Sequence, residues 1–346
     1  MKRIDWFWFI ILLGAALALA AFLDRATGAP PVLPPLGLPV TAARVELGRK
    51  LFFDTRLSSD NRTACATCHD PNKGWADKNM VAVGSFGRRG TRNSPTIINS
   101  VYSPLMFHDG REIGQPAQSL LPLGNRLEMG DQDEDDVMAR LRAIPGYAVL
   151  FAQAYGLKPF PQSPVDKTRF SHALASFEST IVSFDAPIDK RLEGKVHALR
   201  PQAEIGFGLM QAARCFECHK APQFSDFMLR NNGMEFAMGG RDLGRAAVVQ
   251  ASRARPADIR AFKTATLREI HRTAPYNHAG TMLNLAAVVR HYNRGGARAD
   301  GLRDPFIDPR IRPQGWNLYQ EQCVVRALEE AFGSEAYPYV TRPVLP

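Results

Sequence analysis

The sequence predicts a mainly α-helical protein built from two related domains with long loops. Three observations support this fold class. Apolar residues recur at helical spacing in several segments, whereas the alternation typical of β-strands is nearly absent. Gly and Pro, at 27 and 25 of 346 residues, are slightly above average, which favours a loop-rich chain. A pattern that occurs once in each half of the chain indicates an internal duplication.

The N-terminal residues 1–24 have the composition of a signal or membrane-anchor segment. Lys2 and Arg3 give a positive start, and residues 6–23 then carry no charge. Eighteen apolar residues exceed the core of most cleaved signals and only just reach the length of a membrane span. We therefore expect an uncleaved anchor, with a cleaved signal as the alternative. Either one places the body of the protein in the periplasm.

A Pro-rich linker at residues 25–40 should be an extended tether, and several helices are expected beyond it. The first has Thr41 as its N-cap, the second begins at Asp166, and the third follows Pro201. Another runs from Leu285 to Tyr292. The expected apolar faces of the first three are Val40, Ala43, Leu47 and Leu51; Phe170, Ala173, Leu174, Phe177 and Ile181; and Ile205, Leu209 and Met210.

The repeat consists of a helix that leads into a Cys-x-x-Cys-His pentapeptide. Glu-Leu-Gly and Leu-Phe precede the first pentapeptide at 46–48 and 51–52, and Glu-Ile-Gly and Leu-Met precede the second at 204–206 and 209–210. An aromatic residue, a small residue and an aspartate follow each one, at 75–77 and 224–226. We place the boundary near residue 190, which gives an N-terminal domain at 41–190 and a C-terminal domain at 191–346.

The two pentapeptides predict two covalently attached haem groups. A c-type haem needs two thiols for thioether bonds and an imidazole for the iron, and Cys-x-x-Cys-His supplies all three on one turn. A zinc site would need a cage of four ligands and would leave the histidines unexplained. The attachment residues are Cys65 and Cys68, then Cys215 and Cys218; His69 and His219 are the expected proximal iron ligands.

The remaining cysteine and the net charge suggest no further chemistry. Cys323 lies in a segment that also has a helical pattern, where a small buried apolar residue is its expected role. The net charge of +9 is compatible with nucleic-acid binding. The basic residues are scattered, however, and the only dense run is Arg88, Arg89 and Arg92, so we expect no nucleic-acid partner.

Between about residues 42 and 315 the chain resembles the bacterial diheme cytochrome c peroxidase family, which includes MauG-type enzymes. The matching blocks occur in the family's order, which makes the resemblance specific. They are Leu47-Gly48 with Leu51–Asp54, Arg92–Thr96, Phe107–Arg111, Asn125 with Leu127–Gly130, Phe262–Arg268, Thr273–His278 and His291–Gly296.

The resemblance implies roles for individual residues. Glu128 matches a catalytic glutamate that moves a proton between the two peroxide oxygens, which a carboxylate near an open iron can do. Without the resemblance, Glu128 would be taken for a surface charge. Gln118 matches a neighbouring glutamine of the same pocket. The family also holds a calcium ion between its domains, and Asn93, Thr273 and Pro275 match its oxygen ligands.

The chain departs from the reductively activated peroxidases at three positions. Their loop histidine, which blocks the N-terminal iron at rest, is replaced by Ser85 or Phe86, so this iron should be open. Fourteen residues beyond His278, a methionine ligand of the C-terminal haem is replaced by Tyr292, as in MauG-type enzymes. A tyrosinate should lower the reduction potential; a core aromatic residue is the alternative. The tryptophan between the haems is replaced by His108, which could bridge by hydrogen bonds or ligate an iron.

Three functions follow from these expectations. The first is a periplasmic peroxidase that reduces hydrogen peroxide at the N-terminal haem, with electrons from a small cytochrome c or cupredoxin relayed through the C-terminal haem. The second is a MauG-like oxidase that uses peroxide to oxidise residues of a partner protein. The third, a non-catalytic electron carrier, fits poorly with Glu128 and an open iron.

Overall fold

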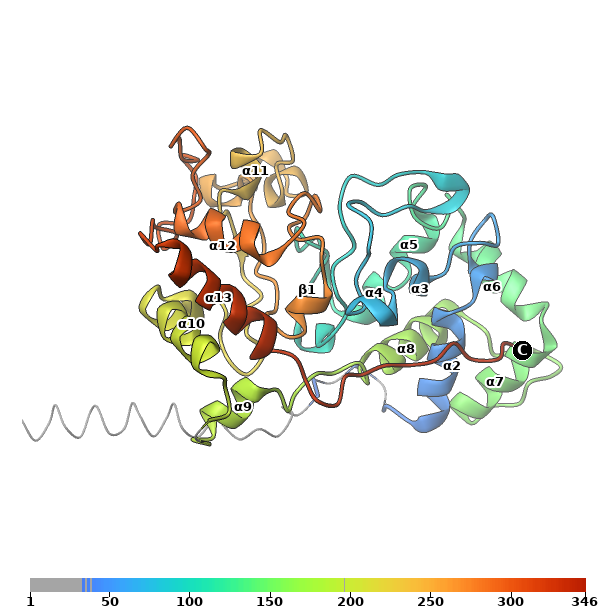
Figure 1. Cartoon of the computed structure of the whole chain (residues 1–346). Coiled ribbons are helices and arrows are strands. Elements are labelled where there is room, and N and C mark those ends of the chain that lie inside the picture. Colours follow the sequence, from blue (N-terminus) through green and yellow to red (C-terminus); the bar gives the residue numbers. More distant parts are fainter. Residues whose placement is uncertain (1–32, 35, 38, 196) are drawn as a thin grey trace, which may run out of the picture.

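The structure is a computed structural model that describes residues 33, 34, 36, 37, 39–195 and 197–346 (Figure 1). The expected signal or anchor at residues 1–24 and most of the Pro-rich linker lie outside the described residues. Within the described part, no helix has the length and apolar character needed to cross a membrane.

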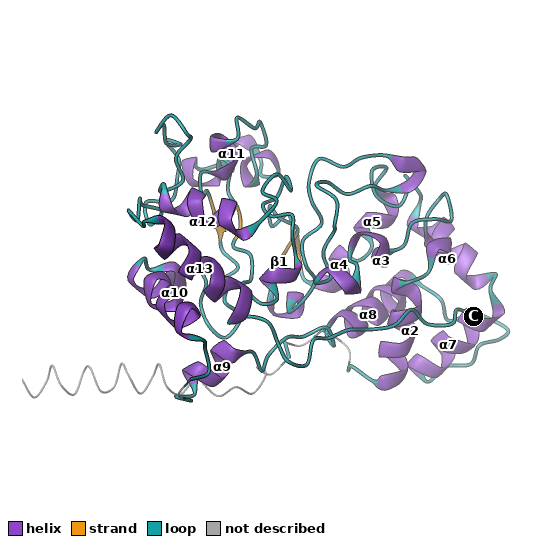
Figure 2. Cartoon of the chain, in the orientation of Figure 1, coloured by secondary structure: helices purple, strands orange, loops and turns teal. Residues whose placement is uncertain are grey.

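The described chain is mainly α-helical, as the sequence predicts, and long loops join short elements (Figure 2). Its strands are two-residue pairs: β1 (Leu105–Met106) with β2 (Glu112–Ile113), and β3 (Leu229–Arg230) with β4 (Phe262–Lys263). The helices are α2 (Ala42–Phe52), α3 (Cys65–Cys68), α4 (Gln115–Gln118), α5 (Leu121–Gly124), α6 (Glu134–Arg142), α7 (Pro145–Tyr155), α8 (Lys167–Glu178), α9 (Pro187–Leu192), α10 (Pro201–Ala212), α11 (Met234–Ala237), α12 (Leu285–Asn293) and α13 (Leu318–Glu330).

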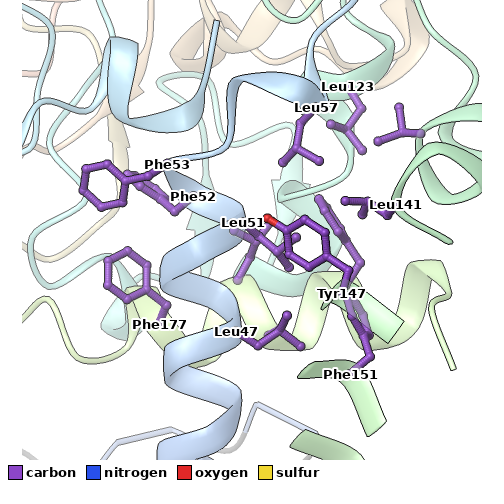
Figure 3. Close-up of a cluster of buried hydrophobic side chains, with 14 of the residues drawn as sticks. Leu47, Leu51, Phe52, Phe53, Leu57, Leu123, Leu141, Tyr147, Phe151 and Phe177 are labelled. Carbon is purple, nitrogen blue, oxygen red and sulfur yellow. The ribbon is translucent and has the colours of Figure 1, made fainter. Parts of the chain in front are cut away.

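In the N-terminal half, α2 crosses α8 and the two helices share one hydrophobic core (Figure 3). The predicted caps are confirmed: Thr41 accepts a hydrogen bond from the first turn of α2, and Asp166 does so for α8. The helices cross closely at Gly48, where a side chain would collide with the carbonyl of Ala173. Leu47, Leu51, Phe52 and Phe177 are buried around this crossing.

In the C-terminal half, α10 crosses α13 in the same manner, with Gly206 against the carbonyl of Cys323. Cys323 is fully buried, which confirms its expected role as a small apolar residue. The predicted apolar face of α10 is wrong at Ile205, which is 45% exposed. The buried face contains Ala203, Gly206, Phe207 and Met210, because the close crossing requires small residues there.

The loops of the two halves also share local geometry. The aromatic residue after each pentapeptide, Trp75 or Phe224, has a positive φ angle, which is uncommon for a bulky side chain. Thr96 donates a hydrogen bond to the carbonyl before Trp75, and Thr266 donates one to the carbonyl before Phe224, both at 2.6 Å. The same conformation of the chain therefore follows both pentapeptides.

The two halves meet through a reciprocal pair of backbone hydrogen bonds. The N–H of Asn93 donates to the carbonyl of His278 at 2.7 Å, and the N–H of Lys263 donates to the carbonyl of His108 at 2.6 Å. These residues correspond pairwise at a constant offset of 170 residues. The junction therefore has approximate two-fold character, as interfaces between identical partners do.

The C-terminal tail leaves its own half and lies along the N-terminal half, where it ends near α2 and α7 (Figure 1). The carbonyl of Pro338 accepts the indole N–H of Trp75 at 2.9 Å. Pro346 packs against Gly146, the second residue of α7. Residues beyond about 336 therefore complete the core of the other half.

Candidate haem-binding and peroxide site

The first pentapeptide has the geometry that a haem group needs. Cys65 and Cys68 lie one turn apart on α3, are partly buried and form no disulfide. The Nδ1 atom of His69 is hydrogen-bonded to the carbonyls of Pro95 at 3.0 Å and Trp75 at 3.3 Å. A carbonyl partner on Nδ1 fixes the ring and leaves Nε2 available for iron.

The second pentapeptide repeats this arrangement. Cys215 begins a short 3₁₀ turn and Cys218 caps its end, and both are likewise free of disulfides. The Nδ1 atom of His219 is hydrogen-bonded to the carbonyl of Phe224 at 3.2 Å. Free thiols, a fixed imidazole and an available Nε2 in both halves fit one haem group each.

Glu128 lies in a tight turn between α5 and α6. Its carboxylate accepts a hydrogen bond from Asn125 Nδ2 at 2.7 Å. Burial raises the pKa of Glu128, although the positive charge of Arg111 opposes this. Its negative charge in turn raises the pKa values of Cys65 and Cys68, so the carboxylate lies close to the first haem motif.

Gln118 is the last residue of α4 and is half-buried. One turn earlier on the same helix, Gln115 is fully buried and hydrogen-bonded to Glu178 of α8 at 3.1 Å. Sequence reasoning missed Gln115 and Glu178, because they are 63 residues apart and no motif contains them.

The loop at Ser85 and Phe86, where the reductively activated peroxidases have their blocking histidine, is held by backbone hydrogen bonds. Ser85 N–H donates to the carbonyl of Glu128, and Phe86 N–H donates to the carboxylate of Asp60, both at 2.8 Å. A side chain at Gly84 would collide with the carbonyls of Leu127 and Glu128. The side chain of Phe86 is 63% exposed. The loop therefore packs tightly on the Glu128 turn and offers no iron ligand there.

Tyr292 lies in the last turn of α12, as expected, and faces the second haem motif. Burial raises the pKa of Tyr292 to about 12, and the thiols of Cys215 and Cys218 are close enough to add to this shift. Asn232 donates a hydrogen bond to the Tyr292 hydroxyl at 3.2 Å, and its carbonyl binds His291 at 2.9 Å. Asn232 therefore fixes the orientation of this end of the helix.

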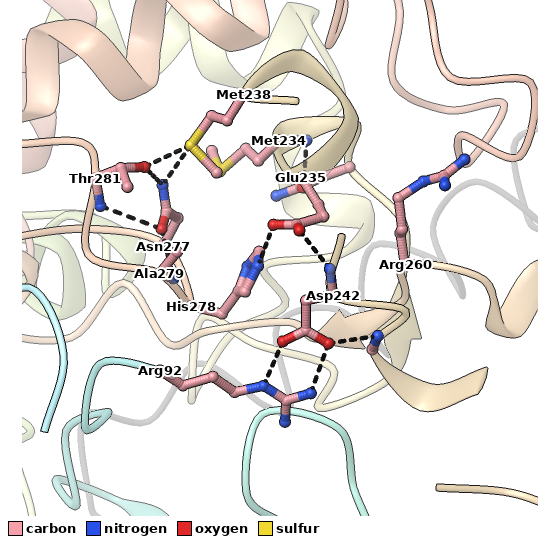
Figure 4. Close-up of polar contacts among 12 residues, drawn as sticks. Arg92, Met234, Glu235, Met238, Asp242, Arg260, Asn277, His278, Ala279 and Thr281 are labelled. Carbon is pink, nitrogen blue, oxygen red and sulfur yellow. Dashed lines mark hydrogen bonds and ion pairs between the residues drawn. The ribbon is translucent and has the colours of Figure 1, made fainter. Parts of the chain in front are cut away.

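His108 and His278 occupy corresponding positions at the junction of the halves. His108 Nε2 is hydrogen-bonded to the carbonyl of Asn93 at 3.0 Å, and burial lowers the pKa of His108 to about 3. His278 Nε2 is hydrogen-bonded to Glu235 at 2.7 Å (Figure 4). The ring of His278 stacks on Phe262 with centroids 3.7 Å apart.

A two-point ion pair joins the halves beside these histidines. Arg92 binds both carboxylate oxygens of Asp242, at 2.6 and 2.8 Å (Figure 4). Arg92 also contacts Asp109, which the first half contributes. Paired hydrogen bonds of this kind fix relative orientation as well as adding energy, so they hold both histidines in register across the junction.

The residues expected to bind calcium lie on segments that pack together. The Asn93 side chain donates to the carbonyl of Asn79 at 2.7 Å, and a side chain at Gly74 would meet Thr273. Pro275 is buried nearby in sequence. Asp77 is buried with its Oδ2 atom lacking a hydrogen-bond partner within the described residues. Carboxylate and carbonyl oxygens of this kind suit calcium.

Comparisons with known proteins agree with this geometry. The family model for di-haem cytochrome c peroxidase matches residues 42–197. The methylamine utilization protein MauG of Methylorubrum extorquens is 36% identical over 313 residues, covering 90% of this chain and 84% of that protein. The cytochrome c551 peroxidase of Pseudomonas aeruginosa is 33% identical over 260 residues, covering 73% and 72% of the two chains.

Solved structures show the same fold. A MauG-like protein associated with microbial copper homeostasis aligns with a TM-score of 0.79 at 25% identity, over 91% of this chain and 96% of that one. The diheme peroxidase BthA of Burkholderia thailandensis aligns with a TM-score of 0.72 at 18% identity, over 92% and 94%. With both haem motifs in place and relatives matched over most of their length, the chain belongs to the family of di-haem cytochrome c peroxidases and MauG proteins.

Proposed function

We propose that this chain is a peroxidase that reduces hydrogen peroxide in the N-terminal haem pocket, with electrons arriving through the C-terminal haem. The observation that carries the proposal is the buried carboxyl of Glu128, held by Asn125 beside the first haem motif. The four cysteines would hold the haem groups, which would supply the iron chemistry and relay electrons from the redox partner. Hydrogen peroxide and a small redox protein, a cytochrome c or a cupredoxin, are the proposed partners.

Glu128 is the proposed catalytic residue because its raised pKa suits it to accept a proton and return it. An efficient acid-base group has a pKa near the working pH. Asn125 positions the carboxylate, and the Ser85 N–H bonded to the Glu128 carbonyl fixes the backbone beneath it. Gln118, on the neighbouring helix α4, is proposed to orient the substrate in the same pocket.

The proposed electron route between the haem sites runs through His108. His69 is hydrogen-bonded to the carbonyl of Pro95. Two residues earlier in the chain, the carbonyl of Asn93 is hydrogen-bonded to the ring of His108. The carbonyl of His108 is bonded to Lys263, two residues before Ala265, whose backbone interacts with His219. Covalent and hydrogen bonds therefore connect both proximal histidines without an indole. We propose that His278 contacts the cofactor edge beside this route.

A MauG-like oxidase, which oxidises residues of a partner protein, is the second candidate. Tyr292 supports it, because the hydroxyl faces the second haem motif and Asn232 fixes its orientation. As a sixth ligand, an anionic oxygen would favour oxidised iron. Glu128 and the loop at Ser85 and Phe86 serve both functions.

The remaining assignments are also proposals. We propose periplasmic localisation, with residues 1–24 as signal or anchor and 25–40 as linker. We propose one calcium ion at Asn93, Thr273 and Pro275, supported by the Asp77 Oδ2 atom, which has no hydrogen-bond partner among the described residues. The haem domains at 41–190 and 191–346 are proposed to descend from a duplicated unit, which the matching helix crossings and loops support.

The test is peroxide turnover by the protein as isolated, without prior reduction, using a small cytochrome c as electron donor. Glu128→Gln should lower kcat by about 10²- to 10⁴-fold, the usual contribution of a proton-transfer group. The surface variant Glu329→Gln is the matched control and should leave kcat unchanged. An unaltered kcat in Glu128→Gln would exclude Glu128. A protein with no response to peroxide would be an electron carrier instead.

A further inference from the structure

Glu178 and Gln115 form a buried polar pair that the proposed mechanism does not use. Glu178, at the end of α8, is 8% exposed, and Gln115, at the start of α4, is 2% exposed. Gln115 Nε2 donates to Glu178 at 3.1 Å and to Ser100 at 2.8 Å. Gln115 Oε1 is buried without a hydrogen-bond partner in the described residues. A pair of this kind costs stability in an apolar core.

Electrostatics place this carboxyl beside the first haem motif. The negative charges of Glu178 and Glu128 each raise the pKa of Cys65, so both carboxyls approach one thiol. Burial raises the pKa of Glu178 to about 8, which the hydrogen bond from Gln115 only partly opposes. Glu178 therefore holds a proton at neutral pH.

Neighbouring charges do not explain this protonation. The elements packed against α8 include the turn Ser100–Tyr102, α2, α4 and α6. Their ionisable residues are Tyr102 on the turn, Arg44, Glu46, Arg49 and Lys50 on α2, and Glu134, Asp135, Asp136, Arg140 and Arg142 on α6. None of these contributes to the pKa shift of Glu178, and within the described chain no Lys or Arg pairs with it. The carboxyl is thus isolated from cations.

The second half of the chain provides an internal comparison. Gln115, the first residue of α4, corresponds to Leu285, the first residue of α12, because the two lie 170 residues apart. Ala173 and Cys323 correspond, because each has the carbonyl that meets the crossing glycine of its half. Glu178 lies five residues after Ala173 and Leu328 lies five residues after Cys323, so these two residues correspond as well. Leu285 and Leu328 are both 5% exposed in the C-terminal core. Packing alone is therefore satisfied by two leucines at these positions.

Among the described residues, the polar pair occurs only in the half that carries Glu128, and α4 connects it to the proposed pocket through Gln118. Reduction of one peroxide breaks the O–O bond and consumes two electrons and two protons to give two waters. Glu128 moves a proton that is already on the peroxide, so both consumed protons must enter separately. The electrons come from the redox partner and the protons from solvent.

We propose that Glu178, positioned by Gln115, is a proton-loading residue of the N-terminal haem pocket that takes up one of the two protons consumed with each peroxide. The proposal rests on the peroxidase function. Glu178 does not touch the peroxide: it passes its proton through the Gln118 and Glu128 side of the pocket, and solvent then reprotonates it. Its coupling to the haem is reciprocal: an electron added to the haem favours a proton on the carboxyl.

The test is the reduction potential of the N-terminal haem as a function of pH, measured in the haem-loaded protein without peroxide. In the unaltered protein the potential should fall as the pH rises through about 8, because reduction takes up a proton at Glu178. Glu178→Gln should remove this dependence, whereas Glu128→Gln should keep it. The potential of the C-terminal haem is the internal control in each titration.

Two further variants separate this role from a structural one. Gln115→Met removes a donor that favours the charged carboxylate, so the pH-dependent range should move upward. The double variant Gln115→Leu, Glu178→Leu copies the leucines of the second half and should fold without any pH dependence. If the reduction potential of the N-terminal haem still falls with rising pH in Glu178→Gln, the proposal is overturned.

The outcome also distinguishes this proposal from the peroxidase function. If the reduction potential depends on pH through Glu178 but the protein does not turn over peroxide, proton loading is supported and the proposed function is rejected. If the protein turns over peroxide and Glu178→Gln leaves the pH dependence of the potential unchanged, the proposed function is supported and proton loading is rejected.

Discussion

At the scale of single residues, Tyr292 is the side chain that we propose tunes the C-terminal haem. Its hydroxyl faces the Cys215–His219 motif and is oriented by Asn232. A tyrosinate donor stabilises oxidised iron, whereas a thioether donor such as methionine raises the reduction potential. The contrast makes this residue the most direct test of the MauG-like features.

Tyr292→Met should raise the reduction potential of the C-terminal haem and leave that of the N-terminal haem unchanged. Redox titration with spectroscopic detection measures both values in one sample. Tyr292→Phe, which offers no ligand, is the control for loss of the hydroxyl alone. Equal potentials in the unaltered protein and Tyr292→Met would show that Tyr292 does not ligate iron.

The raised pKa of Glu178 also predicts how the free energy of unfolding depends on pH. Its pKa of about 8 in the folded protein lies above the ordinary value of 4.5 that it has in an unfolded chain. Between these values the folded state holds a proton that the unfolded state releases, so this residue lowers stability as pH rises. Its contribution has a slope of up to about 1.4 kcal/mol per pH unit.

Chemical unfolding of the haem-loaded protein at several pH values between 5 and 8 measures this slope. Glu178→Gln should gain stability over the unaltered protein, and the gain should increase with pH across that range. A gain that is constant with pH would mean that Glu178 is ionised in the folded protein.

At the scale of elements, the helix crossings depend on one glycine in each half. A Cβ atom at Gly206 would lie 1.9 Å from the carbonyl oxygen of Cys323, a backbone atom that cannot swing away. Two residues along α10, a Cβ atom added at Gly208 would have no described atom within 4 Å. The two glycines therefore form a matched pair on one helix.

Gly206→Ala should destabilise the protein by more than about 1 kcal/mol, because α10 and α13 must separate. Gly208→Ala should stabilise it by about 0.5–1 kcal/mol, the helix-propensity difference between the two residues. Thermal unfolding of the two variants side by side measures both effects. Equal shifts in the two variants would contradict the close crossing.

These crossings also show what sequence reasoning could and could not find. The caps of α2 and α8 were predicted correctly because Thr41 and Asp166 act on adjacent backbone groups. The face of α10 was wrong at Ile205, because an apolar stripe gives no weight to the glycine that sets the crossing. Cys-x-x-Cys-His spacing predicts both proximal histidines because the geometry of the motif is local, and that assignment stays a prediction.

Contacts between residues far apart in the chain could not be predicted from the sequence. Gln115 and Glu178 meet across 63 residues and belong to no motif, so the pair carried no signal. The junction bonds at Asn93 and Lys263 use backbone atoms, which every residue possesses. The internal offset of 170 residues could have suggested the correspondence of His108 and His278, but not that their carbonyls accept reciprocal bonds.

At the scale of the whole molecule, the C-terminal tail ties the two halves together. Pro338 accepts the Trp75 indole N–H, and Tyr337 donates its hydroxyl to the carbonyl of Pro71 at 2.5 Å. Trp75 is fully buried, so loss of its partner would leave an unsatisfied donor in the core. Such a group costs about 1–3 kcal/mol.

Truncation after Glu335 should therefore lower the unfolding free energy and increase hydrogen exchange around residues 69–75. Truncation after Thr341 keeps Tyr337 and Pro338 and serves as the control, with a smaller effect expected. Both measurements use the haem-loaded protein. Unchanged exchange near Trp75 in the shorter protein would show that the tail does not support the first haem motif.

The tail also fixes the order in which the enzyme matures. Pro338 follows Trp75 by 263 residues, yet its carbonyl binds the indole of Trp75, and the backbone carbonyl of Trp75 in turn holds His69. The N-terminal half, which the ribosome makes first, is therefore completed only after residue 338 has been added, whereas the core of α10 and α13 closes without the tail. A chain interrupted between Glu330 and Tyr337 would carry both cysteine pairs and still lack a finished N-terminal unit.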